Sequence, residues 1–353
     1  GDEIIFTDYD RTWGTNGIVI DSNGLNYQSF SDSFFLAYDT DGTTLHIVYS
    51  GATNGWIPTL DKAVDISDGN SEGIFGYGRY SSTTVSITNL ISNTGVASAD
   101  VTGVGTARFL VAACEYGGNK GIFGFGNDGS YVGMTNLVSS SGVVAADVAA
   151  VGTATIGRAA CGYGGDKGIF GFGNDGSATA VTNLVTNGGV VGTDVTGVGT
   201  AREQLAACEY GYDKGIFGFG GGNPAQYGVT NLVSNAGVVA SDVSAVGDAR
   251  YGPAACGYGY DKGIFGYGQT DGSGTTTNIS NTISNVGVVS SDVTGVGTAR
   301  RFPSATQYGG DKGIFGYGET TAVTNLVSNV GVVATDTTGV GTARHSLAGC
   351  SFN

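Results

Sequence analysis

Histidine, proline and basic residues are scarce in this chain of 353 residues. It has two histidines, four prolines, one methionine and two tryptophans. His46 and His345 lie far apart in the sequence, so they cannot supply the histidine-rich ligand set of a transition-metal enzyme. Lysine and arginine total 15 against 30 acidic residues, which gives a net charge of −15. This balance argues against nucleic acid and anionic membranes as partners, because both attract a basic surface.

Signals for membrane insertion, secretion and calcium binding are also missing. No apolar run reaches the length of a membrane span, and no secretory signal is visible. The segments 39–42, 127–130 and 174–177 resemble parts of a calcium loop, but none continues into the full ligand set that ends in glutamate. We interpret them as turns. The sequence therefore predicts no bound metal and no cofactor.

The cysteines do not form a metal or disulfide pattern. They occupy one position of an internal repeat, and Thr306 stands at that position in another copy. An odd number of equivalent cysteines is not a disulfide framework, and the CxxC spacing of metal sites is absent. We predict small, buried and reduced side chains. The five cysteines are Cys114, Cys161, Cys208, Cys256 and Cys350.

Glycine and aromatic residues are abundant instead. The chain has 65 glycines, 18 tyrosines and 16 phenylalanines, and 40% of its residues are hydrophobic. Glycine does not occur at every third position, which excludes a collagen helix, and the hydrophobic content argues against disorder. This composition, rich also in threonine and valine, predicts many short strands joined by tight turns.

An internal repeat dominates residues 69–353. The tetrapeptide GIFG recurs every 47 to 50 residues, and each copy is followed by an asparagine, an aspartate and a glycine at constant mutual spacing. All changes in length therefore fall between GIFG and the asparagine. GIFG begins at Gly73, Gly121, Gly168, Gly215, Gly263 and Gly313, and the aspartates are Asp100, Asp147, Asp194, Asp242, Asp292 and Asp336.

Each copy of the repeat predicts four short strands. In the fourth copy these cover residues 205–210, 215–219, 229–234 and roughly 238–246. Four strands in about 47 residues are typical of a β-propeller blade. The first copy lacks its first strand, and a matching strand follows Arg344 at the end of the chain. We therefore predict an all-β protein with a six-bladed propeller of four-stranded blades over residues 69–353. The C-terminal strand would close the ring on the N-terminal blade, and residues 1–68 would form a small β-rich domain.

The repeated charged residues favour a structural role. An arginine near the start of most copies is expected to form ion pairs or turn hydrogen bonds with the repeated aspartates. A catalytic site usually occurs once, so these residues do not predict an enzyme. In one copy Thr155 stands at the arginine position and Arg158 follows, which we interpret as a copy without the pair. The arginines are Arg108, Arg202, Arg250, Arg300 and Arg344.

The repeat resembles the kelch repeat of β-propellers. Two residues separate Arg202 from LAACEYGYDKGIFGFG, and the whole segment has the kelch order of an arginine, a strand of small residues, a Tyr-Gly turn and an apolar strand that ends in glycines. The tryptophan usual in the last kelch strand is missing. The resemblance covers about residues 69–353 and implies the architecture rather than a particular function.

Residues 1–68 do not repeat. Residues 34–38 and 45–49 flank DTDGTT, which predicts a hairpin. The segment HIVYSGATNGWIP resembles small β-domains of appendage proteins in marine and cyanobacterial tailed phages, and the GIFGYG…TNLVSN arrays resemble marine phage structural proteins. This resemblance implies a virion fibre or similar appendage, commonly a homotrimer, assembled in the host cytoplasm. Residues 1–68 would contact other virion proteins.

Variation between the copies coincides on one predicted face. The loop between the second and third strands and the residues after the arginine position differ from copy to copy, whereas the other turns are nearly uniform. Variable loops on a rigid scaffold are typical of binding surfaces, and polar and aromatic side chains suit a host-surface glycan or protein. The candidate binding residues are Arg79, Tyr80, Phe109, Tyr131, Glu203, Gln226, Tyr227, Tyr251, Arg301, Phe302 and His345.

These observations predict a non-enzymatic phage virion appendage, either a tail fibre or a capsid-decorating protein, whose propeller adheres to the host surface. One alternative is a non-viral bacterial lectin or scaffold propeller, which would be extracellular or at the cell surface. A polysaccharide-active enzyme ranks last. Because uniform repeats fold without any selected site, a purely structural head is a further alternative.

Overall fold

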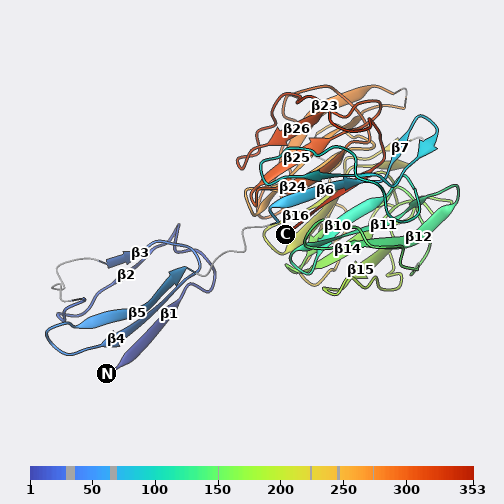
Figure 1. Ribbon diagram of the computed structural model, residues 1–353. Helices are drawn as coiled ribbons and strands as arrows, with labels where there is room; N and C mark the ends of the chain where they lie inside the picture. The colour runs from blue at the N-terminus through green and yellow to red at the C-terminus, as the bar shows by residue number, and fades with distance from the viewer. Residues whose placement is uncertain (29–35, 64–69, 150, 223–224, 245–246, 273) are drawn as a thin grey trace. The chain divides into compact units, whose positions relative to one another are not determined.

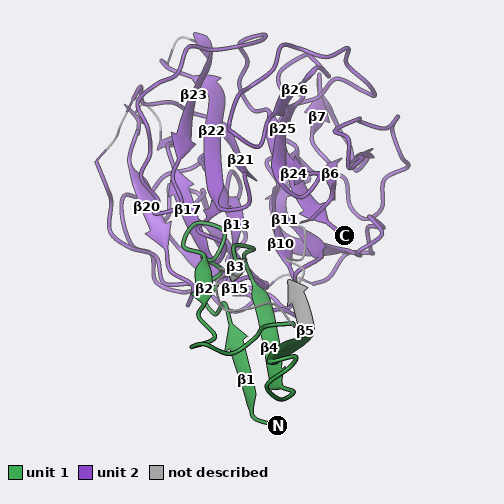
Figure 2. Cartoon of the chain, turned by 90° about the vertical axis from the view of Figure 1, so that its left-hand side faces the viewer, with its two compact units in different colours: residues 1–68 green, residues 69–353 purple. Residues whose placement is uncertain are grey.

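A computed structural model describes residues 1–28, 36–63, 70–149, 151–222, 225–244, 247–272 and 274–353. All regular elements in these ranges are strands, which confirms the predicted all-β class. No helix that the described residues form is long and apolar enough to cross a membrane. The chain divides into two compact units, Gly1–Asp68 and Gly69–Asn353, drawn in green and purple in Figure 2.

Unit 1 contains two small antiparallel sheets, in the orders β1-β4-β5 and β2-β3. Tyr27, Leu45 and Ile47 form its buried core. The predicted hairpin across DTDGTT was wrong for the described residues, because β3 pairs with β2 whereas β4 pairs with β1 and β5. Residues 34 and 35 of that hairpin lie outside the described ranges. The strands are β1 (Glu3–Thr7), β2 (Ile18–Ile20), β3 (Leu36–Tyr38), β4 (Thr43–Tyr49) and β5 (Trp56–Ala63).

The described residues of unit 2 form six three-stranded antiparallel sheets, one for each copy of the repeat. GIFG lies on the middle strand of each. In sheet order, the first three sheets are β27 (Ala348–Phe352), β6 (Glu72–Gly76), β9 (Thr88–Ile91); β10 (Ala112–Tyr116), β11 (Lys120–Asn127), β12 (Tyr131–Val138); and β13 (Ala159–Tyr163), β14 (Lys167–Gly171), β15 (Thr182–Val185). The other three are β16 (Ala206–Tyr210), β17 (Lys214–Gly218), β20 (Thr230–Val233); β21 (Ala254–Tyr258), β22 (Lys262–Gln269), β23 (Thr276–Ile283); and β24 (Ser304–Tyr308), β25 (Lys312–Gly316), β26 (Thr324–Val327). Two short hairpins are β7 (Arg79–Tyr80) with β8 (Thr83–Thr84), and β18 (Gly221–Gly222) with β19 (Ala225–Gln226).

The fourth strand predicted for each copy is not a continuous strand. In the sheet β16-β17-β20, the segment that follows β20 pairs with it through two isolated bridges, Val243 with Thr230 and Val239 with Val233, and through a hydrogen bond from the N–H of Ala240 to the carbonyl of Leu232. The side chain of Asn231 donates to the carbonyl of Ala240 at 3.0 Å. A side chain thus takes the place of a ladder hydrogen bond, which explains why the prediction of four-stranded sheets was wrong.

Glycine in GIFG permits neighbouring sheets to approach closely. A Cβ atom on Gly218 would lie 2.5 Å from the ring of Phe265 in the next sheet, and one on Gly215 would lie 2.5 Å from Sγ of Cys161 in the preceding sheet. Real Cβ atoms do not come this close, so a larger residue would push the sheets apart. The space between sheets is filled by aromatic pairs such as Phe219 and Phe265, whose ring centroids are 5.1 Å apart in an edge-to-face arrangement.

The first strands of the six sheets contact one another in a cycle. β10 contacts β13, β13 contacts β16, β16 contacts β21, β21 contacts β24, β24 contacts β27, and β27 contacts β10. The pairing of the C-terminal strand β27 with β6 was predicted and is confirmed, and Figure 1 places the C-terminus beside β6.

A cycle of backbone hydrogen bonds follows the same order at one end of the sheets. The cycle has six members, one for each sheet. The backbone N–H of each member donates to the carbonyl of the next member, and the last member donates to the first, over N–O distances of 2.6 to 3.3 Å. All six residues have φ between 51° and 62°, a region that side-chain-bearing residues rarely adopt. In donor order the members are Leu110, Ser346, Phe302, Gly252, Gln204 and Gly157.

Candidate functional site

A buried arginine connects the strands of each sheet. Arg202 donates from Nε to the carbonyl of Phe219 at 2.7 Å and from Nη2 to Oδ1 of Asn231 at 2.7 Å. Its guanidinium lies 4.2 Å from the ring centroid of Phe172 in the preceding sheet. The predicted ion pairs with aspartate occur at Arg108–Asp147, Arg250–Asp292 and Arg344–Asp100, with separations of 3.7, 3.7 and 3.9 Å. These repeated charges connect the strands of a sheet with one another and with the neighbouring sheet.

In the sheet β13-β14-β15 the buried guanidinium belongs to an arginine at a different position of the repeat. Arg158 donates to the carbonyl of Phe172 at 3.0 Å and to Oδ1 of Asn183 at 2.7 Å, and it lies 4.2 Å from the ring of Phe125. Thr155, at the usual arginine position, has a buried hydroxyl without a hydrogen-bond partner. Arg158 therefore keeps the guanidinium hydrogen bonds of the other copies, although it forms no ion pair with an aspartate of the described residues.

The copies vary in two segments, the residues after the arginine position and the loop between the second and third strands. These segments meet at one end of the sheets, and we call this end the variable end. Isolated bridges pair a residue that follows the arginine position with the loop between the second and third strands. In the sheet β24-β25-β26 an ion pair joins the two segments, with Arg301 Nε 3.0 Å from Glu319 Oε1. The bridges are Arg79–His345, Phe109–Asn127, Ile156–Asn174, Glu203–Gly221 and Tyr251–Gln269.

Six of the candidate binding residues form a row of neighbouring side chains at the variable end. The guanidinium of Arg79 lies 4.9 Å from the ring centroid of Phe109. Arg79 and His345 exchange two backbone hydrogen bonds, each 3.0 Å long. We call this set the arginine–aromatic row: Phe109, Arg79, His345, Phe302, Arg301 and Tyr251.

The row continues through aromatic contacts of Phe302. Its ring centroid lies 6.3 Å from that of His345 and 5.5 Å from that of Tyr251. The guanidinium of Arg301 lies 5.5 Å from the same ring. Burial is the main cause that lowers the pKa of His345, and the charges of Arg79 and Arg301 add to it. The imidazole therefore lies in a positive electrostatic environment.

The other candidates lie on separate loops of unit 2. Tyr80 on β7 and Tyr131 on β12 are 39% and 40% exposed. Gln226 lies on β19, and the N–H of the adjacent Tyr227 donates to the carbonyl of Gly220. Glu203 accepts a hydrogen bond of 3.0 Å from Asn174. These residues extend the polar surface around the row without belonging to it.

A pocket at the variable end was not predicted. It is lined by the two residues of each sheet that follow the bridge residues, among them Gln204, Leu205, Phe302 and Pro303. Gln204 Oε1 is buried and has no hydrogen-bond partner in the described part of the chain. The sequence signal was the variation in the three residues that follow the arginine position, which include Gln204. Nothing in this variation distinguished Gln204 from its neighbours.

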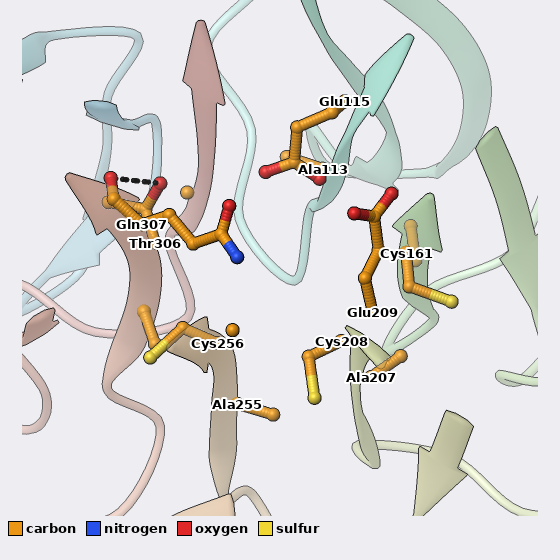
Figure 3. A pocket seen from close by; sticks show the side chains of 14 residues that line it. Ala113, Glu115, Cys161, Ala207, Cys208, Glu209, Ala255, Cys256, Thr306 and Gln307 are labelled. Carbon is orange, nitrogen blue, oxygen red and sulfur yellow. Dashed lines mark hydrogen bonds between the residues drawn. The ribbon is translucent and has the colours of Figure 1, made fainter. Parts of the chain in front are cut away.

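A second unpredicted feature is the central cavity, lined by residues from all six first strands. Figure 3 shows the carboxylates of Glu115 and Glu209 and the amide of Gln307 pointing into this shared space. Two other sheets have glycine at the same repeat position. A Cβ on Gly162 would lie 1.4 Å from Oε1 of Glu209, and one on Gly257 would lie 1.9 Å from Nε2 of Gln307. The glycines thus make room for the long side chains.

The two glutamates of the central cavity have different surroundings. Glu115 accepts hydrogen bonds from the backbone N–H and the hydroxyl of Ser351, at 2.9 and 2.8 Å. Burial, followed by repulsion from Glu115, raises the pKa of Glu209 to about 8. Glu209 is therefore mostly protonated at neutral pH, which avoids two facing negative charges in the cavity.

Replacing Glu209 by glutamine should stabilise the protein above neutral pH. Folded Glu209 keeps its proton up to about pH 8, whereas the unfolded chain releases it near 4.5. The folded state binds more protons in this window, so wild-type stability falls as pH rises through it. We expect E209Q to melt several degrees above the wild type at pH 8 and together with it at pH 4.5, in thermal unfolding followed by circular dichroism. E72Q, a substitution at the partly buried start of β6, is the control and should not change the pH dependence. An E209Q protein with the wild-type pH dependence would contradict the assignment.

The five cysteines are free and buried, as predicted. Burial raises the pKa of each thiol, which makes the thiols poor nucleophiles and metal ligands at neutral pH. Each lies against the first glycine of GIFG in the next sheet, and Thr306 contacts Gly73 in the same way. The position therefore requires a small side chain. Among the described residues, no group of three or more histidine, cysteine or acidic side chains could hold a metal ion.

Comparison with known proteins assigns no family to the chain. It matches no protein-family model, and no curated protein shows significant similarity to it. The geometry and chemistry of its own residues are therefore the basis for a function.

Proposed function

We propose that unit 2 is a six-bladed β-propeller in which each three-stranded sheet, with its bridged outer segment, is one blade. Three observations support this architecture: the cyclic contacts of the first strands, the pairing of β27 with β6, and the cycle of six backbone hydrogen bonds. In a propeller the corresponding ends of all blades lie on one face. The arginine–aromatic row would then cross one face of the propeller near its centre.

On this basis the protein is a phage virion appendage, a tail fibre or capsid-decorating protein, whose propeller adheres to a glycan or protein of the host surface. The observation that carries this proposal is the concentration of variable sequence and of arginine and aromatic side chains at the variable end. Most loops of a repeat protein could be identical without loss of stability. Variation on one face of an otherwise uniform scaffold is the pattern of a recognition surface.

The opposite end of the sheets is nearly uniform by contrast. Lysine and aspartate form the same ion pair in the turn after four of the first strands, with N–O distances of 2.5 Å. In three of these turns the aspartate also accepts a hydrogen bond from an asparagine, as Asp213 does from Asn235 at 3.1 Å. A surface built from repeated turns offers no unique set of contacts, so we assign recognition to the variable end.

A non-catalytic role fits the placement of the acidic residues. Glycosidases need a pair of carboxyl groups around the bond they cleave, and Glu115 and Glu209 both point into the central cavity. The central cavity that holds them has a volume of about 30 Å³, which is room for a water molecule rather than a sugar ring. The pair is therefore a structural feature of the cavity.

The virion setting rests on the resemblance of unit 1 and of the repeat array to phage appendage proteins. Unit 1 would attach the chain to other virion proteins and would form a homotrimer. Light scattering of the purified full chain should then give three times the mass of one chain. A monomer would refute the trimer and leave the recognition role to be tested separately.

The recognition role is tested by binding of the full chain to a glycan array and to intact bacteria. The double variant F109A/Y251A removes two aromatic rings of the row and should weaken binding by at least about tenfold. Y212A/Y260A is the matched control, because it removes two exposed tyrosines from the uniform turns. It should bind within about twofold of the wild type. Failure of the wild type to bind either target, or equal loss in both variants, would refute the proposal.

A further inference from the structure

The cationic side chains of unit 2 fall into three groups. Five lysines lie at the starts of the middle strands, at the uniform end. Six arginines are buried between the sheets, with exposures of 0 to 4%. The remaining arginines are Arg79 and Arg301, and both belong to the arginine–aromatic row together with the titratable His345. The lysines are Lys120, Lys167, Lys214, Lys262 and Lys312, and the buried arginines are Arg108, Arg158, Arg202, Arg250, Arg300 and Arg344.

Arg79 provides the uncompensated charge of this group. It forms no ion pair with a carboxylate of the described residues, and its Nε atom is buried without a hydrogen-bond partner there. A buried guanidinium N–H without an acceptor is costly unless a ligand or water supplies the acceptor. Arg79 therefore carries a guanidinium charge without a carboxylate partner, next to the ring of Phe109.

Arg301 is partly compensated. Its Nε pairs with Glu319 at 3.0 Å, and its Nη1 donates to Oε1 of Gln269 at 2.6 Å. The guanidinium side chain is still 40% exposed, so it can also meet a ligand. The charge of Glu203 acts on Tyr251, at the far side of the row. Arg79, which has no carboxylate partner among the described residues, and the adjacent His345 are therefore the uncompensated part of the row.

We propose that the arginine–aromatic row binds an acidic saccharide, with its anionic group on Arg79 and His345 and its sugar ring against Phe302 and Phe109. Guanidinium groups bind carboxylates and sulfate esters through charge-assisted hydrogen bonds, and aromatic faces pack against the C–H faces of sugars. The remainder of the protein carries excess negative charge, which would repel polyanions elsewhere on its surface. This inference rests on the proposed recognition role and names the ligand class of the same site.

The test compares acidic and neutral saccharides on the full chain. The probes are polygalacturonate oligosaccharides, which carry carboxylates, carrageenan oligosaccharides, which carry sulfate esters, and their carboxyl-reduced and desulfated counterparts. We expect at least one acidic probe to bind about tenfold or more tightly than its neutral counterpart. The probe that binds identifies the anionic group.

Variants then locate the charge requirement. R79Q should abolish the preference for the acidic probe, R79K should restore part of it, and K214Q, which removes the same charge at the uniform end, should preserve it. Equal binding of acidic and neutral probes, or an R79Q variant with unchanged preference, would overturn the acidic ligand while leaving the recognition role intact. If no saccharide binds but intact bacteria do, the saccharide inference fails and a protein receptor is indicated. If nothing binds, the recognition role itself fails.

Discussion

A chain truncated after Leu347, which lacks β27, should lose the cooperative folding of unit 2. β27 pairs with β6 along five residues, and it places Ala348, Cys350 and Phe352 in the core between neighbouring sheets. Loss of Phe352 alone would cost about 3–5 kcal/mol, and the whole strand would exceed the 5–15 kcal/mol by which domains are typically stable. We expect a loss of near-ultraviolet circular dichroism, binding of a hydrophobic dye, and aggregation through the exposed edge of β6.

Removal of Asn353 alone is the matched control for this truncation. Asn353 is exposed and lies beyond β27, although its N–H donates to the carbonyl of Asn119 at 3.1 Å. Its loss should shift the melting temperature by only a few degrees. A chain without β27 that melts cooperatively at the temperature of the wild type would show that the C-terminal strand does not complete the first sheet.

Replacing Arg158 by leucine should lower the melting temperature by roughly 10 °C, since each kcal/mol corresponds to about 2–4 °C in a domain of this size. The substitution leaves the carbonyl of Phe172 and the Oδ1 of Asn183 without their donor, whereas the carbonyl of Val181 keeps the backbone N–H of Phe172. Each unsatisfied buried acceptor costs about 1–3 kcal/mol. Leucine itself is compatible with the position, because Leu205 and Leu347 occupy it in two other sheets.

The double variant T155R/R158L provides the rescue. Arginine at position 155 has the same sequence distances to Phe172 and Asn183 that Arg108 has to Phe125 and Asn136. It should therefore restore the melting temperature to within a few degrees of the wild type. T155R alone should destabilise, because two guanidinium groups would compete for one site. A double variant that melts as low as R158L would show that the site requires the backbone position of Arg158.

The periodicity of the sequence was sufficient to predict most of the fold. GIFG predicted the six middle strands, and the unmatched strand at the C-terminus predicted its pairing with β6. The fourth strand could not be predicted correctly, because a pattern of valines does not reveal that the side chain of Asn231 replaces ladder bonds. The role of Arg158 was also missed. In this copy the arginine stands three residues later than in the others, which breaks the repeat in the sequence. The long side chain of Arg158 nevertheless reaches the same acceptors.

The candidate site was predicted less completely. Loop variation correctly indicated which segments of the sheets to examine, since bridges join these segments in the structure. The order of Phe109, Arg79, His345, Phe302 and Tyr251 depends on contacts between sheets, and one copy of the repeat contains no information on them. Glu115 and Glu209 lie on strands that otherwise read as apolar. Their proximity follows only from the way the first strands surround the central cavity.

Hydrogen exchange of the full chain, with and without its tightest-binding saccharide, tests most directly whether the variable end is the recognition surface. The amides of Phe109, Tyr251 and His345 take part in bridges there and should exchange measurably. We predict slower exchange on binding at these residues and at Arg79 and Phe302, with no change in the uniform turns around Lys167 and Lys214. Protection confined to the uniform turns or to unit 1 would contradict the account.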